Sequence, residues 1–360
     1  MPGTCEIDPL TACEIDVKLV ALDRAGGPEF VDELRRIWEA GDAAFPVDQR
    51  LPAAAKQHIC SQMRVGEPVE PGDALVLATS GSTGTPKGVV LTHDAVAASA
   101  RATSARLGVT ADDHWLACLP LNHVGGLSVV TRALVTGTRL TVQPGFDAAA
   151  VMASGATLVS LVATALQRID PAVFRVIVLG GSRPPADRPP NTVTTYGMTE
   201  TGSGVVYDRV PLDGVEVRIV DDEIQLRGPM LLRCYRDGRD PKTPDGWLPT
   251  GDLGEIGPDG LLSVHGRADE LIITGGENVW PEPVEAVLRT VPGVVDVAVA
   301  GTADPEWGQV VTAHVVGDVT LDALRAAVKQ QLPAFYAPKL VVRHDSLPRT
   351  SLGKLRRTSL

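Results

Sequence analysis

The sequence has no long hydrophobic run and no excess of positive charge. Its longest apolar runs, such as residues 158–165, fall far short of the roughly 20 residues that a membrane-spanning helix requires. Residues 1–16 carry several acids in place of the basic start of a secretory signal. The net charge of −11 leaves no general basic surface for a nucleic-acid backbone. We therefore expect a cytoplasmic protein with no membrane span and no nucleic-acid partner.

Cysteine is also scarce. The five cysteines show neither CxxC spacing nor the Cys/His spacing of a metal site: Cys5, Cys13, Cys60, Cys118 and Cys234. We interpret them as reduced thiols with no ligand role. The 360 residues, 44% hydrophobic and 21% charged, have the balance of a globular protein with one large and one small domain.

The order of apolar patterns predicts a large layered α/β domain followed by a smaller one. Between residues 74 and 195 strand-like runs alternate with helical ones, and we expect helices over 29–40 and from a cap at Asp94 to about Leu107. From Gly214 short alternating strands indicate a β-rich subdomain. After Arg267 the order helix, strand, strand, helix, strand predicts a small α+β domain. The predicted domains are residues 1–267 and a mobile domain over 268–360.

A stretch rich in glycine and hydroxyl groups, residues 79–88, separates two apolar runs. Its glycines allow successive N–H groups to surround phosphate oxygens, and Lys87 adds a cation. A Walker A loop needs Gly-Lys-Ser/Thr and then a helix, whereas here Pro86 precedes the lysine, Gly88 follows it, and a strand comes next. A flexible Ser/Gly linker is the alternative. The predicted phosphate-binding residues are Thr79, Ser80, Gly81, Ser82, Thr83, Gly84 and Lys87.

Four further segments complete an ordered series. They read TTYGMTE at 194–200, WLPTGD at 247–252, GRADELI at 266–272 and PRTSLGK at 348–354. With residues 79–88 they resemble the motifs of the adenylate-forming superfamily, which includes acyl-CoA synthetases, luciferases and adenylation domains. The resemblance covers the chain from about residue 74 to its end. It implies ATP, Mg²⁺ and coenzyme A as ligands.

Within the nucleotide motif, the residue types suit the roles that the resemblance implies. Tyr196 offers an aromatic face for adenine, and Gly197 lets the backbone come close. Thr199 would bind the α-phosphate. Glu200 would be the magnesium ligand, because Mg²⁺ binds through one or two carboxylates plus substrate phosphates. Taken alone, Tyr196 is more readily a packed core aromatic.

The ribose and adenine contacts follow from the same resemblance. Asp252 would accept hydrogen bonds from the ribose hydroxyls, with Arg267 as a second contact. Taken alone, Asp252 is equally an ordinary turn residue. Gly181 and Ser182 follow a strand, where ligands of α/β proteins commonly bind, and would border the adenine.

The resemblance assigns catalysis to Lys354, which would stabilise charge between the acid's carboxylate and the α-phosphate. A lysine in such a loop is otherwise normally solvated. Two steps are implied. In the first step the acid attacks the α-phosphorus to give acyl-AMP and pyrophosphate. The small domain then rotates about Asp269. In the second step CoA enters past residues 275–278, which include Gly276, and displaces AMP.

Two residues bear on the identity of the acid. His123, in a segment that resembles the family's acyl pocket, either contacts the acid or is a structural turn histidine. Arg132, in a predicted apolar helix, would pair with a second substrate carboxylate, or is an exposed helix arginine. Within the superfamily the chain is most similar to the o-succinylbenzoate–CoA ligases of menaquinone biosynthesis. That acid carries two carboxylates.

The chain departs from the family pattern because its phosphate loop begins near residue 79, so much of the usual N-terminal region is missing. Apolar surface left uncovered predicts a homodimer. Three alternatives remain: another aryl- or acyl-CoA ligase, an adenylating enzyme that loads a carrier protein, and a catalytically silent nucleotide-binding homologue. The presence of Lys87, Glu200, Asp252 and Lys354 disfavours the last.

Overall fold

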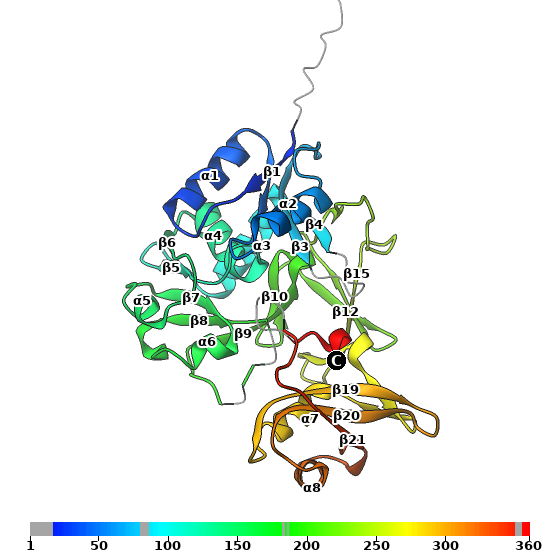
Figure 1. The fold of residues 1–360 in the computed structure, drawn as a ribbon. Coiled ribbons are helices and arrows are strands. Elements are labelled where there is room, and N and C mark those ends of the chain that lie inside the picture. The colour runs from blue at the N-terminus through cyan, green and yellow to red at the C-terminus, as the bar shows by residue number, and fades with distance from the viewer. Residues whose placement is uncertain (1–16, 80–85, 182–183, 186, 350–354) are drawn as a thin grey trace, which may run out of the picture. The chain divides into compact units, whose positions relative to one another are not determined.

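The computed structural model describes residues 17–79, 86–181, 184–185, 187–349 and 355–360. The chain divides into two compact units (Figure 1). Unit 1 contains residues up to Val205 together with Pro229–Asp240, and unit 2 contains Val206–Gly228 and Pro241–Leu360. Unit 2 thus combines the predicted β-rich subdomain with the predicted small domain.

The first sheet of unit 1 has the strand order β1-β2-β3-β4-β14. Its strands are β1 (Leu19–Leu22), β2 (Ala43–Pro46), β3 (Asp73–Thr79), β4 (Lys87–Thr92) and β14 (Cys234–Tyr235). β1, β2 and β3 run parallel, whereas β4 is antiparallel to β3. The first described residues therefore extend the sheet that holds the two ends of the predicted phosphate loop.

Two helices connect the first three strands of this sheet. Helix α1 (Pro28–Glu39) matches the prediction over 29–40, and it buries Phe30, Leu34 and Ile37 at helical spacing. Helix α2 (Ala53–Gln62) has no fully buried residue. Packing of α1 against β1 and β2 gives the N-terminal part of the chain its own apolar contacts.

The second sheet has the order β11-β10-β9-β8-β7-β5-β6. Its strands are β5 (His114–Ala117), β6 (Arg139–Val142), β7 (Leu158–Leu161), β8 (Val176–Leu179), β9 (Thr192–Met198), β10 (Ser203–Tyr207) and β11 (Val210–Pro211). Strands β5 to β9 are parallel neighbours. All residues of β5 and β7 are buried, as expected for parallel strands covered on both faces.

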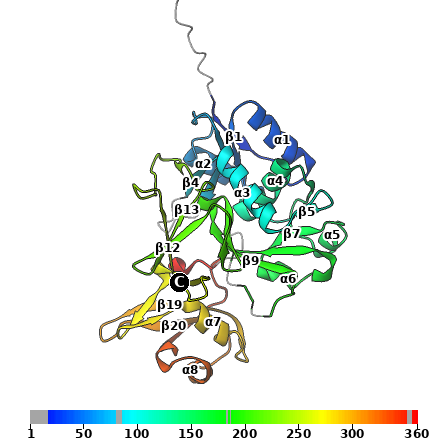
Figure 2. The same ribbon diagram turned by 180° about the vertical axis from the view of Figure 1, so that it is seen from behind.

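Helices α3 (His93–Arg106) and α4 (Val124–Thr136) pack side by side in unit 1 (Figure 2). The predicted cap of α3 was wrong. Thr92 is the N-cap, and its Oγ1 accepts a hydrogen bond from the Ala95 N–H at 3.1 Å. Asp94 lies in the first turn, where its charge still interacts favourably with the helix dipole. The shorter helices of this unit are α5 (Ala148–Met152), α6 (Ala163–Leu166) and the 3₁₀ turn η1 (Pro171–Val173).

Unit 2 contains an antiparallel sheet of order β12-β13-β15-β16. It is formed by β12 (Glu216–Val220), β13 (Glu223–Arg227), β15 (Leu248–Ile256) and β16 (Leu262–Arg267). This sheet is the β-rich subdomain predicted from the turn spacing.

The last sheet has the order β18-β17-β20-β19, and β21 pairs with β20. Its elements are β17 (Ile272–Thr274), β18 (Glu277–Val279), β19 (Val294–Asp304), β20 (Gly308–Gly317) and β21 (Leu340–Arg343), with helices α7 (Pro281–Leu288) and α8 (Leu321–Gln331) and the 3₁₀ turn η4 (Ala334–Tyr336). The fully buried residues of its core all lie between Ile272 and Ala337. The fold is therefore layered α/β with a β-rich part and a small α+β part, as predicted.

The described part of the chain has neither a membrane-spanning helix nor a disulfide. None of its helices is both long and apolar enough to cross a membrane. No disulfide involves Cys60, Cys118 or Cys234 in that part, while Cys5 and Cys13 lie outside the described residues.

Candidate active site

The two ends of the predicted phosphate loop meet at the end of a hairpin. Thr79 and Lys87 are register partners of the antiparallel strands β3 and β4, and Thr79 Oγ1 lies 3.4 Å from the Lys87 carbonyl oxygen. A strand follows Lys87, so the segment differs from a Walker A loop as predicted. Ser80, Gly81, Ser82, Thr83 and Gly84 lie outside the described residues.

Glu200 lies in the 3₁₀ turn η2 (Thr199–Thr201), directly after β9. The hydroxyl of Tyr235 donates to Glu200 Oε1 at 3.0 Å, and the Leu232 N–H donates to the Glu200 carbonyl at 2.7 Å. Burial raises the pKa of Tyr235, and the Glu200 carboxylate raises it further. The phenol therefore stays protonated as a donor. The second carboxylate oxygen of Glu200 has the chemistry that a Mg²⁺ ligand requires, and its role as that ligand stays a prediction.

Tyr235 also faces the cations around the phosphate segment. Lys87 Nζ lies 5.5 Å from the centre of its ring, and the guanidinium carbon of Arg239 lies 4.8 Å from it. One aromatic side chain thus contacts the predicted magnesium ligand and the predicted phosphate cation. No sequence pattern indicated Tyr235, because it comes beside Lys87 only through the pairing of β14 with β4.

Three predicted site segments follow the carboxyl ends of parallel strands in one sheet. Gly181 follows β8, the residues Tyr196 and Gly197 end β9, and His123 comes after β5. Such ends share one edge of the sheet, where ligands of α/β proteins bind. Gly181 has φ +87°, a left-handed conformation that favours glycine. Ser182 lies outside the described residues.

Gly197 is required by close packing of β9 on β10. A Cβ atom at this position would clash with the carbonyl oxygen of Ser203 and lie 2.7 Å from Gly204 Cα. Tyr196 is half-buried beside it, and Thr199 begins the next turn. Buried Thr201 fixes that turn, because its Oγ1 accepts from the Met198 N–H at 2.9 Å and contacts the Ser203 carbonyl at 2.6 Å. The chain itself thus approaches closely at Gly197. The close approach of a ligand at this residue stays a prediction.

His123 is the residue before α4 and is partly buried. Burial lowers its pKa, and nearby Arg50 lowers it further, with Asp48 acting in the opposite direction. The ring is therefore mainly neutral at pH 7. Its role toward an acid stays a prediction.

Arg132 is not the exposed helix arginine considered as an alternative, because only 2% of its surface is accessible. Its Nη2 lies 3.1 Å from both Ser128 Oγ and Ser203 Oγ, and its guanidinium stacks 5.1 Å from the ring centre of Trp115. These contacts tie α4 to β5 and β10 inside unit 1. Its pairing with a substrate carboxylate stays a prediction.

Asp252 and Arg267 are brought together in unit 2. They are register partners on β15 and β16, and Arg267 Nη1 lies 3.4 Å from Asp252 Oδ1 and 2.8 Å from the Thr250 carbonyl. Burial lowers the pKa of Arg267, but the carboxylates of Asp252 and Asp269 outweigh it, so the pKa is raised. Asp252 is 9% exposed, and its carboxyl oxygens can accept hydrogen bonds.

Gly276 lies in a two-residue turn between β17 and β18, where Thr274 pairs with Glu277. Gly275 and Gly276 have φ +61° and +85°, as a type I′ hairpin turn requires. Gly275 also donates its N–H to the Trp307 carbonyl at 2.9 Å. The turn is therefore fixed by its glycines; its contact with CoA stays a prediction.

Lys354 lies outside the described residues, but the chain on either side is described. Arg349 and Leu355 form an isolated antiparallel bridge. Within the described part of the chain, no group of three or more His, Cys, Asp or Glu side chains could hold a metal. A single carboxylate at Glu200 fits Mg²⁺, which takes its remaining ligands from phosphates and water.

The chain matches the family of AMP-binding enzymes over residues 31–235 and the AMP-binding enzyme C-terminal domain over residues 283–354. The chain belongs to the AMP-binding enzyme family. The two matched ranges contain the hairpin of Lys87, the turn of Glu200 and the segment of Lys354.

Relatives with similar sequences carry one name. The chain is 42% identical, over 351 aligned positions, to the probable 2-succinylbenzoate–CoA ligase of Mycobacterium tuberculosis (strain CDC 1551 / Oshkosh), covering 87% of this chain and 91% of the relative. It is 34% identical to the 2-succinylbenzoate–CoA ligase of Enterococcus faecalis (strain ATCC 700802 / V583), covering 84% of this chain and 72% of that protein.

Solved structures give the same likeness in three dimensions. The o-succinylbenzoate CoA synthetase (MenE) from Bacillus subtilis, in complex with the acyl-adenylate intermediate OSB-AMP, is similar with a TM-score of 0.86 and 28% identity, covering 95% of this chain and 87% of that one. The same enzyme in complex with ATP and a magnesium ion gives a TM-score of 0.83 and 27% identity, covering 95% and 88%.

Proposed function

We propose that this AMP-binding enzyme is an ATP-dependent ligase that converts o-succinylbenzoate to its adenylate and then to its CoA thioester. The observation that carries the chemistry is the placement of Glu200 and Lys87 around Tyr235, at the hairpin that holds the ends of the phosphate segment. A carboxylate and an ammonium that both contact one tyrosine suit Mg²⁺ and the phosphates of ATP. The substrate follows from relatives whose names specify 2-succinylbenzoate.

The reaction has two balanced steps. The carboxylate of the acid attacks the α-phosphorus of ATP, and pyrophosphate leaves; the thiol of CoA then attacks the acyl carbon, and AMP leaves. Mg²⁺ held by Glu200 would neutralise phosphate charge. Lys354 would stabilise the charge that develops on the α-phosphate in the first step, while Thr199 binds that phosphate and Asp252 the ribose. No general base is needed for the first step, because a carboxylate is already nucleophilic.

The domain scheme belongs to the same proposal. Residues 268–360 would rotate about Asp269 between the two steps, so that Lys354 serves only the first and the Gly275–Gly276 turn serves the second. The separate core between Ile272 and Ala337 supports this scheme, because a domain with its own core can move as a body.

Two further properties complete the proposal. We place the reaction in the cytoplasm, where ATP and CoA are available. We also propose a homodimer, in which a second subunit covers apolar surface of the first. Sedimentation equilibrium giving a single species of monomer mass would contradict the dimer.

A pyrophosphate-release assay over a panel of aromatic acids, with and without CoA, tests the function. We expect release with o-succinylbenzoate in the absence of CoA and thioester only in its presence. Turnover of benzoate but not of o-succinylbenzoate would point instead to another aryl-CoA ligase. Acyl transfer to a phosphopantetheine carrier protein but not to free CoA would point to a carrier-loading enzyme.

A further inference from the structure

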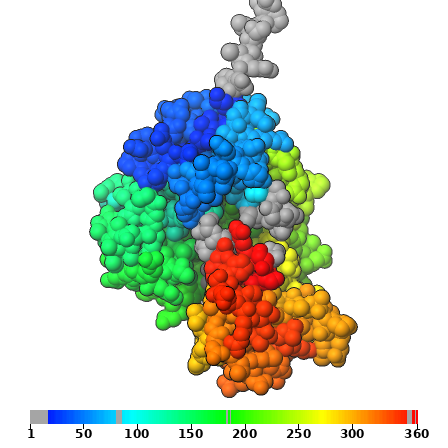
Figure 3. Space-filling view, viewed as in Figure 1, coloured from blue at the N-terminus to red at the C-terminus, as the bar shows by residue number. Residues whose placement is uncertain are grey.

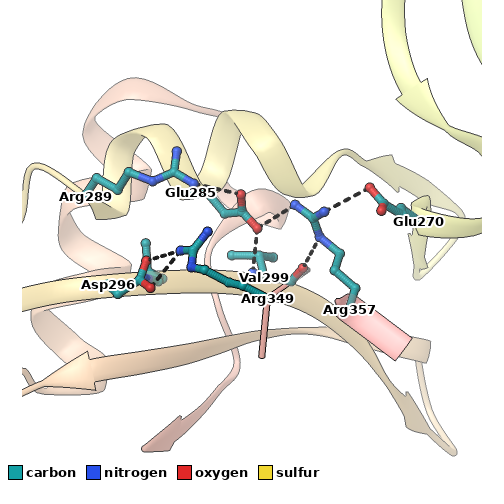
Figure 4. A network of polar contacts seen from close by, with 8 residues as sticks. Glu270, Glu285, Arg289, Asp296, Val299, Arg349 and Arg357 are labelled. Carbon is teal, nitrogen blue, oxygen red and sulfur yellow. Dashed lines mark hydrogen bonds and ion pairs between the residues drawn. The ribbon is translucent and has the colours of Figure 1, made fainter. Parts of the chain in front are cut away.

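Two arginines flank residues 350–354, and both are ion-paired within unit 2 (Figure 4). The first, Arg349, approaches both carboxylate oxygens of Asp296 on β19 at 2.7 Å. Contacts to both oxygens of one carboxylate restrict orientation more than a single contact does. The chain is thereby attached to β19 immediately before the segment that contains Lys354.

Arg357 attaches the chain on the other side. It begins the 3₁₀ turn η5 (Arg357–Ser359), and its side chain is only 13% exposed. Its guanidinium has three acceptors on three elements: Glu285 Oε1 of α7 at 2.7 Å, Glu270 Oε2 of the turn η3 (Ala268–Glu270) at 3.0 Å, and the Val299 carbonyl of β19 at 3.2 Å. A planar donor group held on three sides has little freedom to reorient.

Glu285 is the buried centre of this network. Its side chain is 4% exposed, and it accepts from the Val299 N–H at 2.9 Å as well as from Arg357 and Arg289. A buried ion pair of this kind contributes little net stability, because desolvation offsets the attraction, but it fixes the relative positions of its groups. The network therefore serves geometry more than stability.

The backbone brings the two attached ends together. Arg349 bridges to Leu355, and the Arg356 N–H donates to the Pro348 carbonyl at 2.9 Å. In the space-filling view the red C-terminal residues lie against orange residues of the same unit (Figure 3). Five residues, 350–354, join two ends that are both fixed to the small-domain core.

We propose that Arg349 and Arg357 are positioning residues for the adenylation step, because their ion pairs fix both ends of the segment that carries Lys354. The inference rests on the proposed function, in which Lys354 acts only in that step. A lysine ammonium sits on a flexible four-carbon stem, so its placement depends on the backbone that carries it. A displacement of about 1 Å at such a group costs roughly 100-fold in rate.

The test separates the two half-reactions. Adenylation is measured as pyrophosphate release from ATP and o-succinylbenzoate without CoA, and thioester formation is measured from prepared acyl-adenylate and CoA. Arg349→Gln and Arg357→Gln should each slow adenylation by about 10- to 100-fold, as Lys354→Ala does more strongly, and slow thioester formation by less than about threefold. A merely structural role would slow both.

Arg289→Gln is the matched control. Arg289 also pairs with Glu285, at 3.1 Å, but it is 53% exposed and far along the chain from residues 350–354. Like Arg357→Gln, this variant removes a guanidinium that pairs with Glu285. It should change the rate of neither half-reaction by more than about threefold. Arg357→Lys should recover part of the adenylation rate.

Because Arg357→Gln removes a buried ion pair, thermal unfolding is recorded for each variant. If Arg357→Gln does not fold, Arg349→Gln, which removes a more exposed ion pair, provides the test. Parallel loss of both half-reactions in a folded Arg349→Gln protein, or no loss of adenylation, overturns the proposal. If the wild-type protein forms the adenylate and the Arg349→Gln and Arg357→Gln variants form it at the same rate, this inference is overturned and the proposed function stands. A wild-type chain that forms no adenylate overturns both the inference and the proposed function.

Discussion

Tyr235 connects the residues that we propose bind phosphate and magnesium. Its hydroxyl donates to Glu200, and its ring faces Lys87. Because burial raises its pKa, the hydroxyl remains a donor throughout the neutral range. A hydrogen bond to one oxygen orients the carboxylate of Glu200 and leaves its other oxygen for the Mg²⁺ that we propose it binds.

Removal of the Tyr235 hydroxyl should weaken magnesium binding. Tyr235→Phe keeps the ring beside Lys87 but deletes a hydrogen bond to a charged group, which contributes about 1.5–3 kcal/mol. The Mg²⁺ concentration for half-maximal pyrophosphate release should rise by about tenfold. Tyr336→Phe, in the small domain, is the control and should leave the Mg²⁺ dependence unchanged. An unaltered Mg²⁺ dependence in Tyr235→Phe would show that the Tyr235 hydroxyl does not orient Glu200 for magnesium binding.

The roles of single residues could be predicted where the residues belong to recognisable motifs. The pairing of Asp252 with Arg267 follows from two neighbouring strands, and the family resemblance had placed both at the ribose. Tyr235 could not be predicted, because it lies 35 positions after Glu200 and no periodicity connects the two. The burial of Arg132 was equally hidden, since its partner Ser203 is 71 positions away.

At the scale of the elements, the seven-stranded sheet uses its two edges differently. The predicted ligand residues follow the carboxyl ends of β5, β8 and β9. Near the opposite ends, Arg175 donates to both oxygens of Asp113, at 2.9 and 2.6 Å, just before β8 and β5 begin. The amino edge is thus fixed by an ion pair, and the carboxyl edge carries the candidate site.

Asp113 should make the fold sensitive to acid. Burial alone would raise its pKa, but hydrogen bonds from Arg175, the Thr110 N–H and Thr157 lower it from 3.8 to about 2. Since the folded pKa lies below the unfolded one, the stabilisation is complete above pH 3.8 and is lost as the pH falls toward 2.

In urea unfolding, Asp113→Asn should reduce the free energy of unfolding by about 2 kcal/mol at pH 7. The difference from wild type should shrink as the pH falls from 4 to 2, because the wild-type carboxyl itself becomes protonated as the pH approaches its folded pKa of about 2. Asp318→Asn, at the exposed pair with Arg343, should change stability by less than about 0.5 kcal/mol at either pH. A deficit for Asp113→Asn that is equal at pH 7 and pH 2.5 would contradict this assignment.

The contact between β9 and β10 gives a second prediction at this scale. Gly197→Ala places a Cβ against the Ser203 carbonyl, so the strands must separate beside Tyr196 and η2. We expect a loss of about 1–3 kcal/mol in stability and at least about tenfold in pyrophosphate release. Gly145→Ala is the control, because its Cβ would meet no atom within 4 Å. Equal activity in the two variants would mean that close packing at Gly197 does not position the site.

Elements with strong patterns were predictable, and weak ones were not. The apolar runs of β7 and β8 and the amphipathic α1 were all found from the sequence. The strands β1 and β2 were not identified from the sequence, because no alternation of apolar and polar residues marks them. Helix α2 has no buried residue and therefore no apolar face that helical periodicity could reveal.

At the scale of the whole molecule, the sequence order of the five motifs was more informative than any one of them. Each motif is compatible with a loop or a core residue when taken alone, whereas their order matches a family in which the chain aligns over residues 31–235 and 283–354. The boundary at residues 267 and 268 stays a prediction. Contacts group Val206–Gly228 with the C-terminal residues, although the core between Ile272 and Ala337 is separate.

The most direct measurement of the central claim is mass spectrometry of one reaction in two stages. The chain is mixed with Mg·ATP and o-succinylbenzoate, and CoA is added after the first sample is taken. The account predicts o-succinylbenzoyl-AMP and pyrophosphate in the first sample, and the CoA thioester with AMP in the second. Thioester formation with ADP and phosphate as products, or no adenylate before CoA is added, would contradict it.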